Sequence, residues 1–133
     1  MRLSSLAVSV VAALALANSG CLKDIMMNAQ FAAAREASAA LNTMGDYETA
    51  KAAALSGVGT IEAMNYLKPG NEDGLFMLTK TWLGLGLFFE NDMEAAQDRG
   101  DDAQADIART RARMAYDRSV FYALELLDLV QGR

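Results

Sequence analysis

The feature that most constrains the fold is an almost unbroken apolar stretch at residues 75–89. On a helix with 100° between successive residues, its large side chains spread over nearly the whole circumference. Such a helix is either enclosed by other helices or crosses a membrane, and this stretch is short for a crossing and contains Lys80. It therefore predicts the central helix of a small helical domain. Its apolar stripes are Leu75, Leu78, Trp82, Leu85 and Phe89, then Phe76, Leu83 and Leu87, then Met77 and Phe88.

Two glycines, Gly84 and Gly86, lie inside this predicted helix, where each costs about 1 kcal/mol relative to alanine. One interpretation is that they leave space for a ligand channel with aromatic walls. The other, which we favour, is that the preceding helix crosses closely at Gly57 and Gly59 and that the aromatic rings are ordinary core. Tyr66, Tyr116 and Tyr122 would supply polar groups to such a channel. The candidate ligand- or partner-lining residues are Trp82, Gly84, Gly86, Phe88, Phe89 and Tyr122.

The composition argues for one helical domain and against an enzyme. The chain has 133 residues, is 53% hydrophobic and contains a single proline. It has no histidine, so the usual general base, metal ligand and partner of a nucleophile are missing. Its net charge of −5 argues against a nucleic-acid partner, because the phosphate backbone would repel it. We expect no catalytic residue, no metal and no cofactor.

Residues 90–102 form the most polar segment of the chain. It lacks the alternating oxygen ligands and the terminal glutamate of an EF-hand loop. Glu90 and Glu94 are the carboxylate pair best spaced for acid–base work, but they lie in a segment expected to be solvated. The segment therefore predicts a solvated connector that is helical up to Arg99.

The first residues have the layout of a secretory signal, with Arg2, an apolar run at 6–17 and then small residues. The segment Leu16–Cys21 resembles a bacterial lipobox, which predicts a signal peptide at 1–20 and an acylated Cys21 as the lipid anchor of the domain at 21–133. Cleavage after Ala17 is the alternative, and it would release a soluble periplasmic protein with a free thiol. Leu22 stands where lipoproteins retained at the inner membrane carry Asp, which favours the outer membrane.

Turn and capping signals divide the rest of the chain into helices. A first helix is expected from about Asp24 to Leu41, with Gly45 at its C-terminal end and Asp46 as the N-cap of the next. Lys68-Pro69-Gly70-Asn71 is the clearest turn, and Asn71 is suited to cap the central helix. The inner face of the first helix is predicted to carry Met26, Ala29, Ala33, Ala37 and Ala40.

Two further helices complete the predicted domain. One spans about Tyr47 to Leu67, and the other spans about Asp102 to Val130. The inner stripe of the former is predicted to be Tyr47, Ala50, Ala54, Val58, Ile61 and Met64, and the latter is predicted to bury Ile107, Met114, Phe121 and Leu124.

Helices joined by short turns form antiparallel hairpins, which either stack as a repeat or close as a bundle. The turn before Leu75, Leu78 and Trp82 has the spacing of a degenerate tetratricopeptide-type first helix. We therefore predict an all-α fold of tetratricopeptide-like hairpins, with about four helices after the signal peptide.

Two segments carry a resemblance to a known family. They are Ile61–Asn71, which ends in a Leu-Lys-Pro-x-Asn turn, and Arg111–Leu124, which contains an Arg-x-Arg-x-x-Tyr-x-Arg run. Together with Cys21 and the apolar helix, they resemble the T-component (TatT-like) lipoproteins of tripartite ATP-independent periplasmic (TRAP) transporters over most of residues 45–130.

The resemblance implies a tetratricopeptide-like outer-membrane lipoprotein that faces the periplasm. It further implies a homo-oligomer around a conduit, and binding to the substrate-binding protein during uptake of a small, apolar organic ligand. Since the family continues through further helical pairs, the chain would be a shortened member. The alternative is a general helical-repeat adaptor or structural envelope lipoprotein that binds no small ligand.

Overall fold

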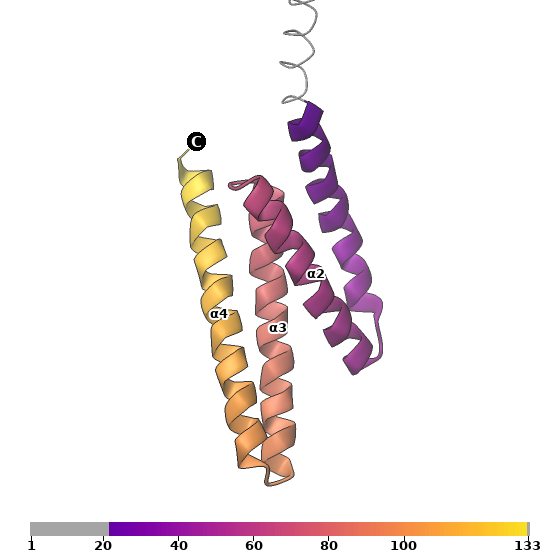
Figure 1. The fold of residues 1–133 in the computed structure, drawn as a ribbon, viewed down its shortest axis with the longest axis vertical. Helices are drawn as coiled ribbons and strands as arrows, with labels where there is room; N and C mark the ends of the chain where they lie inside the picture. The colour runs from indigo at the N-terminus through magenta and orange to yellow at the C-terminus, as the bar shows by residue number, and fades with distance from the viewer. Residues whose placement is uncertain (1–21, 133) are drawn as a thin grey trace, which may run out of the picture.

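The structure is a computed structural model that describes residues 22–132, except for the side chains of residues 41 and 42. Within this range the chain forms four α-helices and no strand, which confirms the all-α prediction. The helices cover residues 22–37, α2 (Tyr47–Leu67), α3 (Glu72–Asp98) and α4 (Asp102–Gln131) (Figure 1). A short 3₁₀ helix, η1 (Ser38–Thr43), follows the first of them. The predicted signal peptide and Cys21 lie outside the described residues.

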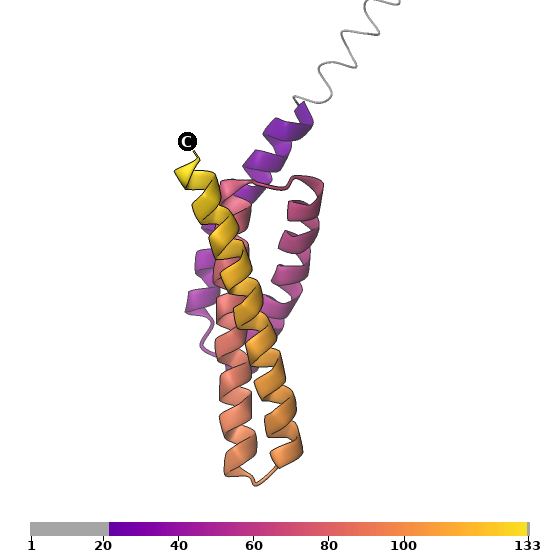
Figure 2. The same cartoon turned by 90° about the vertical axis from the view of Figure 1, so that its left-hand side faces the viewer.

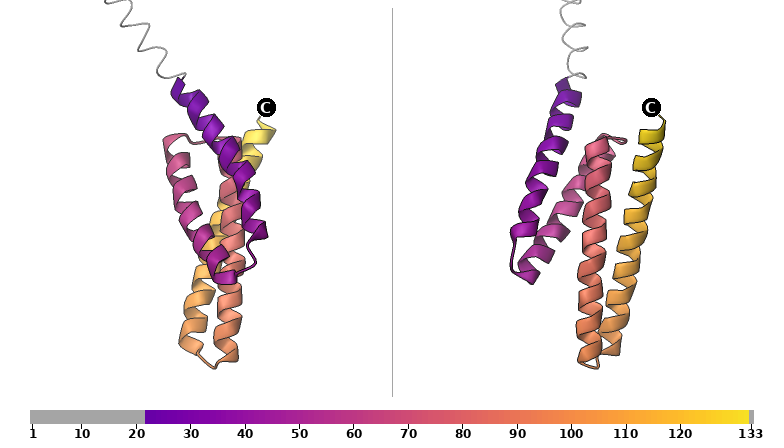
Figure 3. Two further views of the ribbon diagram at one scale, coloured as in Figure 1. Left: turned by 90° about the vertical axis from the view of Figure 1, so that its right-hand side faces the viewer. Right: turned by 180° about the vertical axis from the view of Figure 1, so that it is seen from behind.

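Helix α3 lies in the middle of the molecule, as the apolar stretch predicts. Helix α4 runs antiparallel to it along one side, while α2 and the helix at 22–37 lie on the other side (Figures 1 and 3). Leu75, Leu78 and Leu85 are almost completely buried in the core, and Phe89 is buried one helical turn further on. Burial of these side chains outweighs the cost of the glycines in the same helix.

The helix boundaries follow the capping residues of the sequence. The Asp46 carboxylate accepts a hydrogen bond from the Thr49 amide, and the Asn71 side chain accepts one from the Gly74 amide. Between these helices, Gly70 adopts the left-handed conformation, with φ of 72°, that a residue with a side chain disfavours. The predicted bounds of α2 and the turn before α3 are therefore confirmed.

The predicted inner face of α4 is wrong. Ile107, Met114, Phe121 and Leu124 are all between 45% and 63% exposed. The face that contacts α3 instead consists of small residues and one tyrosine, namely Ala105, Ala108, Ala112, Ala115, Ser119 and Tyr122. Small side chains allow the two helix backbones to approach closely, and dense packing along the whole hairpin outweighs the burial of fewer, larger side chains.

The first helix also turns a different face inward. Phe31 is completely buried, whereas Ala29, Ala33 and Met26 on the predicted inner face are exposed, as are Ala37 and Ala40. The Phe31 ring lies on α3 at Gly74, where a Cβ atom would be 2.7 Å from Phe31 Cε1. Phe31 is the largest apolar side chain of this helix, and its complete burial fixes which face of the helix turns inward.

The end of the first helix differs from the prediction as well. The α-helix stops at residue 37 and tightens into η1 rather than continuing to Leu41. Among the described residues, positive φ angles occur at Gly70 and Gly100 and not at Gly45. Gly45 therefore does not close this helix in the left-handed conformation, because the 3₁₀ turns already end it.

Candidate functional site

Two adjoining hollows lie between the N-terminal segment, α2 and α3, and we call them together the α2–α3 groove. Their volumes are about 150 and 320 Å³. Four residues line both hollows, namely Ser38, Ala54, Met77 and Thr81. The smaller hollow is also lined by Ala50, Lys80, Gly84 and Phe88. The larger one is also lined by Ala34, Ala37, Ala53, Gly57, Thr60, Ile61 and Met64. The lining is largely apolar, so the groove suits an apolar or amphipathic ligand rather than an ion.

The structure brings only two of the predicted lining residues to this groove. Gly84 and Phe88 line it, and a Cβ atom on Gly84 would meet no described atom within 4 Å. Phe89 is buried in the core, and Trp82 and Tyr122 take part in a separate polar cluster. The six residues therefore do not form one aromatic channel.

The close approach predicted at Gly57 and Gly59 is not found, since a Cβ atom on either would meet no described atom within 4 Å. The close approach occurs on the other side of α3, at Gly86. A Cβ atom there would lie 2.4 Å from Tyr116 Cε1 on α4. The Tyr116 hydroxyl donates a 2.6 Å hydrogen bond to Glu90, and desolvation together with this carboxylate raises the pKa of Tyr116 to about 12.

Alanine at Gly84 and at Gly86 is expected to change stability in opposite directions. Gly84→Ala should stabilise the protein by about 1 kcal/mol, because it removes the helix cost of glycine and meets open space. Gly86→Ala should destabilise it by roughly 1–2 kcal/mol, because displacing the Tyr116 ring outweighs the same helix gain. Urea unfolding of the two variants measures the difference, and equal shifts would contradict the packing assigned to Gly86.

A polar cluster that the sequence did not predict joins three helices at Glu62. Its carboxylate accepts hydrogen bonds from Trp82 Nε1 at 2.8 Å, from Arg118 at 2.5 Å and from the Tyr122 hydroxyl at 2.5 Å. The Arg118 guanidinium also lies 5.2 Å from the centre of the Tyr122 ring. The one sequence signal for this cluster was the i,i+4 spacing of Arg118 and Tyr122, since Glu62 comes from a distant helix.

The hydrogen bonds of this cluster shift the ionisation of its members. Partial burial alone would raise the pKa of Glu62, but the hydrogen bonds from Tyr122, Arg118 and Trp82 outweigh it and lower the pKa. Desolvation and the Glu62 carboxylate raise the pKa of Tyr122 to about 12. Glu62 is therefore an ionised hydrogen-bond acceptor that holds α2, α3 and α4 together.

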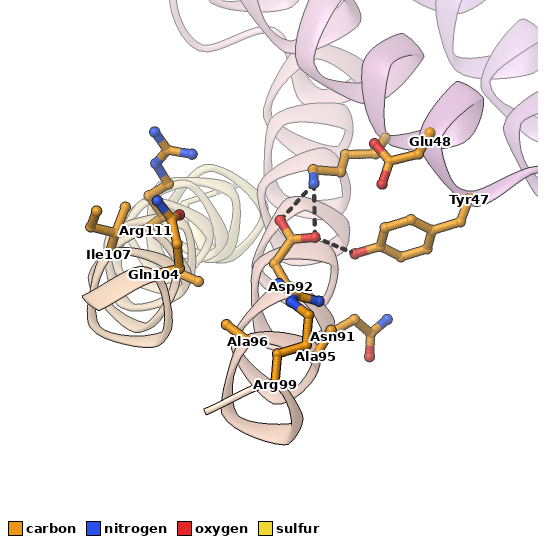
Figure 4. A pocket seen from close by; sticks show the side chains of 12 residues that line it. Tyr47, Glu48, Asn91, Asp92, Ala95, Ala96, Arg99, Gln104, Ile107 and Arg111 are labelled. Atoms are coloured by element: carbon orange, nitrogen blue, oxygen red, sulfur yellow. Dashed lines mark hydrogen bonds and ion pairs between the residues drawn. The ribbon is translucent and has the colours of Figure 1, made fainter. Parts of the chain in front are cut away.

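A larger polar hollow of about 680 Å³ lies where α2 begins, α3 ends and α4 begins (Figure 4). We call it the distal hollow. Asp92 lies at its centre, 2.6 Å from Lys51 Nζ, and it accepts a 3.0 Å hydrogen bond from the Tyr47 hydroxyl. Arg99 and Arg111 line the hollow and form no ion pair with other described residues. The remaining lining residues are Glu48, Asn91, Ala95, Ala96, Gln104, Ile107 and Ala108.

The distal hollow is lined mainly by polar and charged side chains. Desolvation, followed by the hydrogen bond to Asp92, raises the pKa of Tyr47 to about 12, so its hydroxyl stays protonated at neutral pH. Within residues 22–132, no group of three histidine, cysteine, aspartate or glutamate side chains could hold a metal ion. No helix in the described part of the chain is long and apolar enough to cross a bilayer.

Comparison of the chain with protein-family models, with curated proteins and with solved structures found no match.

Proposed function

We propose that the protein is an outer-membrane lipoprotein that faces the periplasm and binds both a partner protein and a small organic ligand in TRAP-type transport. The partner is the periplasmic substrate-binding protein of the transporter, and the helices are hairpins of a tetratricopeptide-like repeat. The proposal is supported by the lipobox-like segment before Cys21, by the family resemblance over residues 45–130, and by the antiparallel helices with short turns.

The observation that carries ligand binding is the α2–α3 groove. It combines an apolar lining with open space beside Gly84 and Gly57, both in helix interiors where glycine is costly. A Cβ atom on either glycine would touch no neighbouring helix among residues 22–132, so the space that each glycine leaves is available to a ligand. Lys80 and Thr81 supply polar groups at the same wall, which could orient one end of an amphipathic molecule.

The test begins with the full-length protein expressed in a Gram-negative host beside a Cys21→Ser variant. Acyl mass on Cys21, and partition to the outer membrane that the variant loses, are the expected results. Purified lipoprotein is then titrated with a fluorescent fatty-acid analogue. Gly84→Leu should abolish binding by filling the groove, while Gly59→Leu, on an exposed part of α2 outside the groove, should leave it intact. Equal affinities in the two variants would contradict a ligand site here.

A helical adaptor that binds no small ligand is the second candidate. Large apolar side chains on exposed helix faces favour it, among them Leu83 and Leu87 on α3 and Phe121 and Leu124 on α4. Capture of the transporter's substrate-binding protein by the purified lipoprotein supports the transport function. Failure to capture the substrate-binding protein, combined with no binding of the fatty-acid analogue to any form of the protein, would favour the adaptor.

A further inference from the structure

We propose that one end of the molecule inserts apolar side chains into the bilayer surface, so that the domain stands upright on the membrane. This end comprises the start of the helix at 22–37, the α2–α3 turn and the C-terminal end of α4, and we call it the proximal end. The inference rests on the proposed acylation of Cys21, and it adds an orientation and a second, non-covalent contact to the lipid anchor.

Contacts between side chains place the α2–α3 turn beside the start of the first helix. Lys68 Nζ lies 3.3 Å from the Asp24 carboxylate, and the Asn71 side chain donates a 2.9 Å hydrogen bond to Asn28. The C-terminus of α4 lies at the same end, and the α3–α4 turn lies at the opposite end (Figures 1 and 2). Three segments that are far apart in the sequence therefore share the proximal end.

Large apolar side chains are exposed on each of these three segments. Tyr66, next to the turn, is 87% exposed, and its neighbour Leu67 is 59% exposed. The others are Leu22, Ile25 and Met26 on the first helix and Leu127 and Val130 on α4. A tyrosine among aliphatic side chains is typical of the membrane interface, where the ring meets the acyl chains and the hydroxyl meets water.

The anchor supplies the reason why lipid, rather than another protein, covers this end. Cys21 directly precedes Leu22, so acyl chains on Cys21 hold the first turn of the helix at the bilayer. Insertion of nearby side chains is then an intramolecular step with an effective concentration in the millimolar range. Even a small apolar surface binds under these conditions, because each inserted CH₂ group contributes about 0.8 kcal/mol.

Neither end of the molecule carries an excess of positive charge. At the proximal end, Lys23 and Lys68 face Asp24, Glu72 and Asp128, so anionic lipids gain nothing there. The distal turn carries Asp98, Asp101 and Asp102 against the single Arg99, and a negatively charged membrane surface would repel this excess of negative charge. The contact is therefore apolar, insensitive to salt, and it directs the distal hollow away from the membrane.

The test uses the acylated full-length protein in vesicles of phosphatidylethanolamine and phosphatidylglycerol. A single added cysteine carries an environment-sensitive fluorophore at Leu67→Cys, at Leu83→Cys, or at Gln97→Cys near the distal turn. Leu83 is the matched control, since it is a similarly exposed leucine halfway along α3. We expect nitroxide-labelled lipids to quench the fluorophore at position 67 and to leave those at 83 and 97 unquenched, at low and at high salt.

Each of the other possible results contradicts a different part of the inference. Protein that floats with the vesicles while the fluorophore at 67 stays unquenched would overturn the inference and leave the lipid anchor intact, and a partner protein would then be the better occupant. Equal quenching at 67 and 83 would overturn the upright orientation. Protein that does not float with the vesicles would overturn the anchor itself, and the inference with it.

Discussion

Replacing Phe31 with alanine is expected to destabilise the docking of the helix at 22–37 by about 3–5 kcal/mol, the usual cost of removing a fully buried phenylalanine. The ring is completely buried against Gly74 on α3. The other links of this helix to α3, such as the 2.5 Å ion pair between Arg35 and Asp73, are partly exposed and contribute little. The helix should therefore separate from the domain before the domain unfolds.

Hydrogen exchange measures this effect directly. In Phe31→Ala, amides of the first helix should lose protection, while those of α3 and α4 keep it. Met26→Ala is the matched control on the same helix, because its side chain is exposed and its loss should change protection little. Uniform loss of protection throughout Phe31→Ala would contradict local separation and would make Phe31 part of the global core.

Replacing Glu62 with alanine is expected to cost about 2–4 kcal/mol, because Trp82 Nε1 and the buried Tyr122 hydroxyl would then lack their acceptor. The Arg118 guanidinium is half exposed, so water replaces most of its interaction. The stability lost in Glu62→Ala should be greatest at neutral pH. A carboxylate with a lowered pKa contributes stability above its unfolded pKa and loses it as the pH falls through the folded value.

Chemical unfolding of wild type and Glu62→Ala at several pH values tests both points. The gap between their free energies of unfolding should be constant near neutral pH and should narrow as the pH falls below the ordinary Glu pKa of 4.5. Glu94→Ala is the control, since Glu94 is an exposed carboxylate on α3 that accepts no hydrogen bond from the described residues. If the difference in free energy of unfolding stays constant at acid pH, the charge of Glu62 is not what stabilises the cluster.

The candidate site was predictable in part. Gly84 and Gly86 correctly indicated unusual space or packing, but the two glycines have different structural roles. Gly84 faces the α2–α3 groove, and Gly86 accommodates the Tyr116 ring from α4. Two residues apart, they lie about 200° around the helix, so one channel could not contain both. Which neighbour meets which face depends on tertiary packing, and the sequence contained no signal for it.

The sequence by itself determined the helices and, apart from the end of the first helix, their boundaries, because capping and turn residues act on the backbone within a few residues. Asp46, Asn71 and the Pro69-Gly70 turn set α2 and the start of α3 where they were predicted. The tertiary structure decided which faces are buried. Alanine and large apolar residues lie on several faces of α4, so periodicity alone cannot choose between them. The buried face of α4 is set by the close approach of α3, because only small side chains such as alanine fit between the two helices. Phe121 and Leu124 therefore remain exposed.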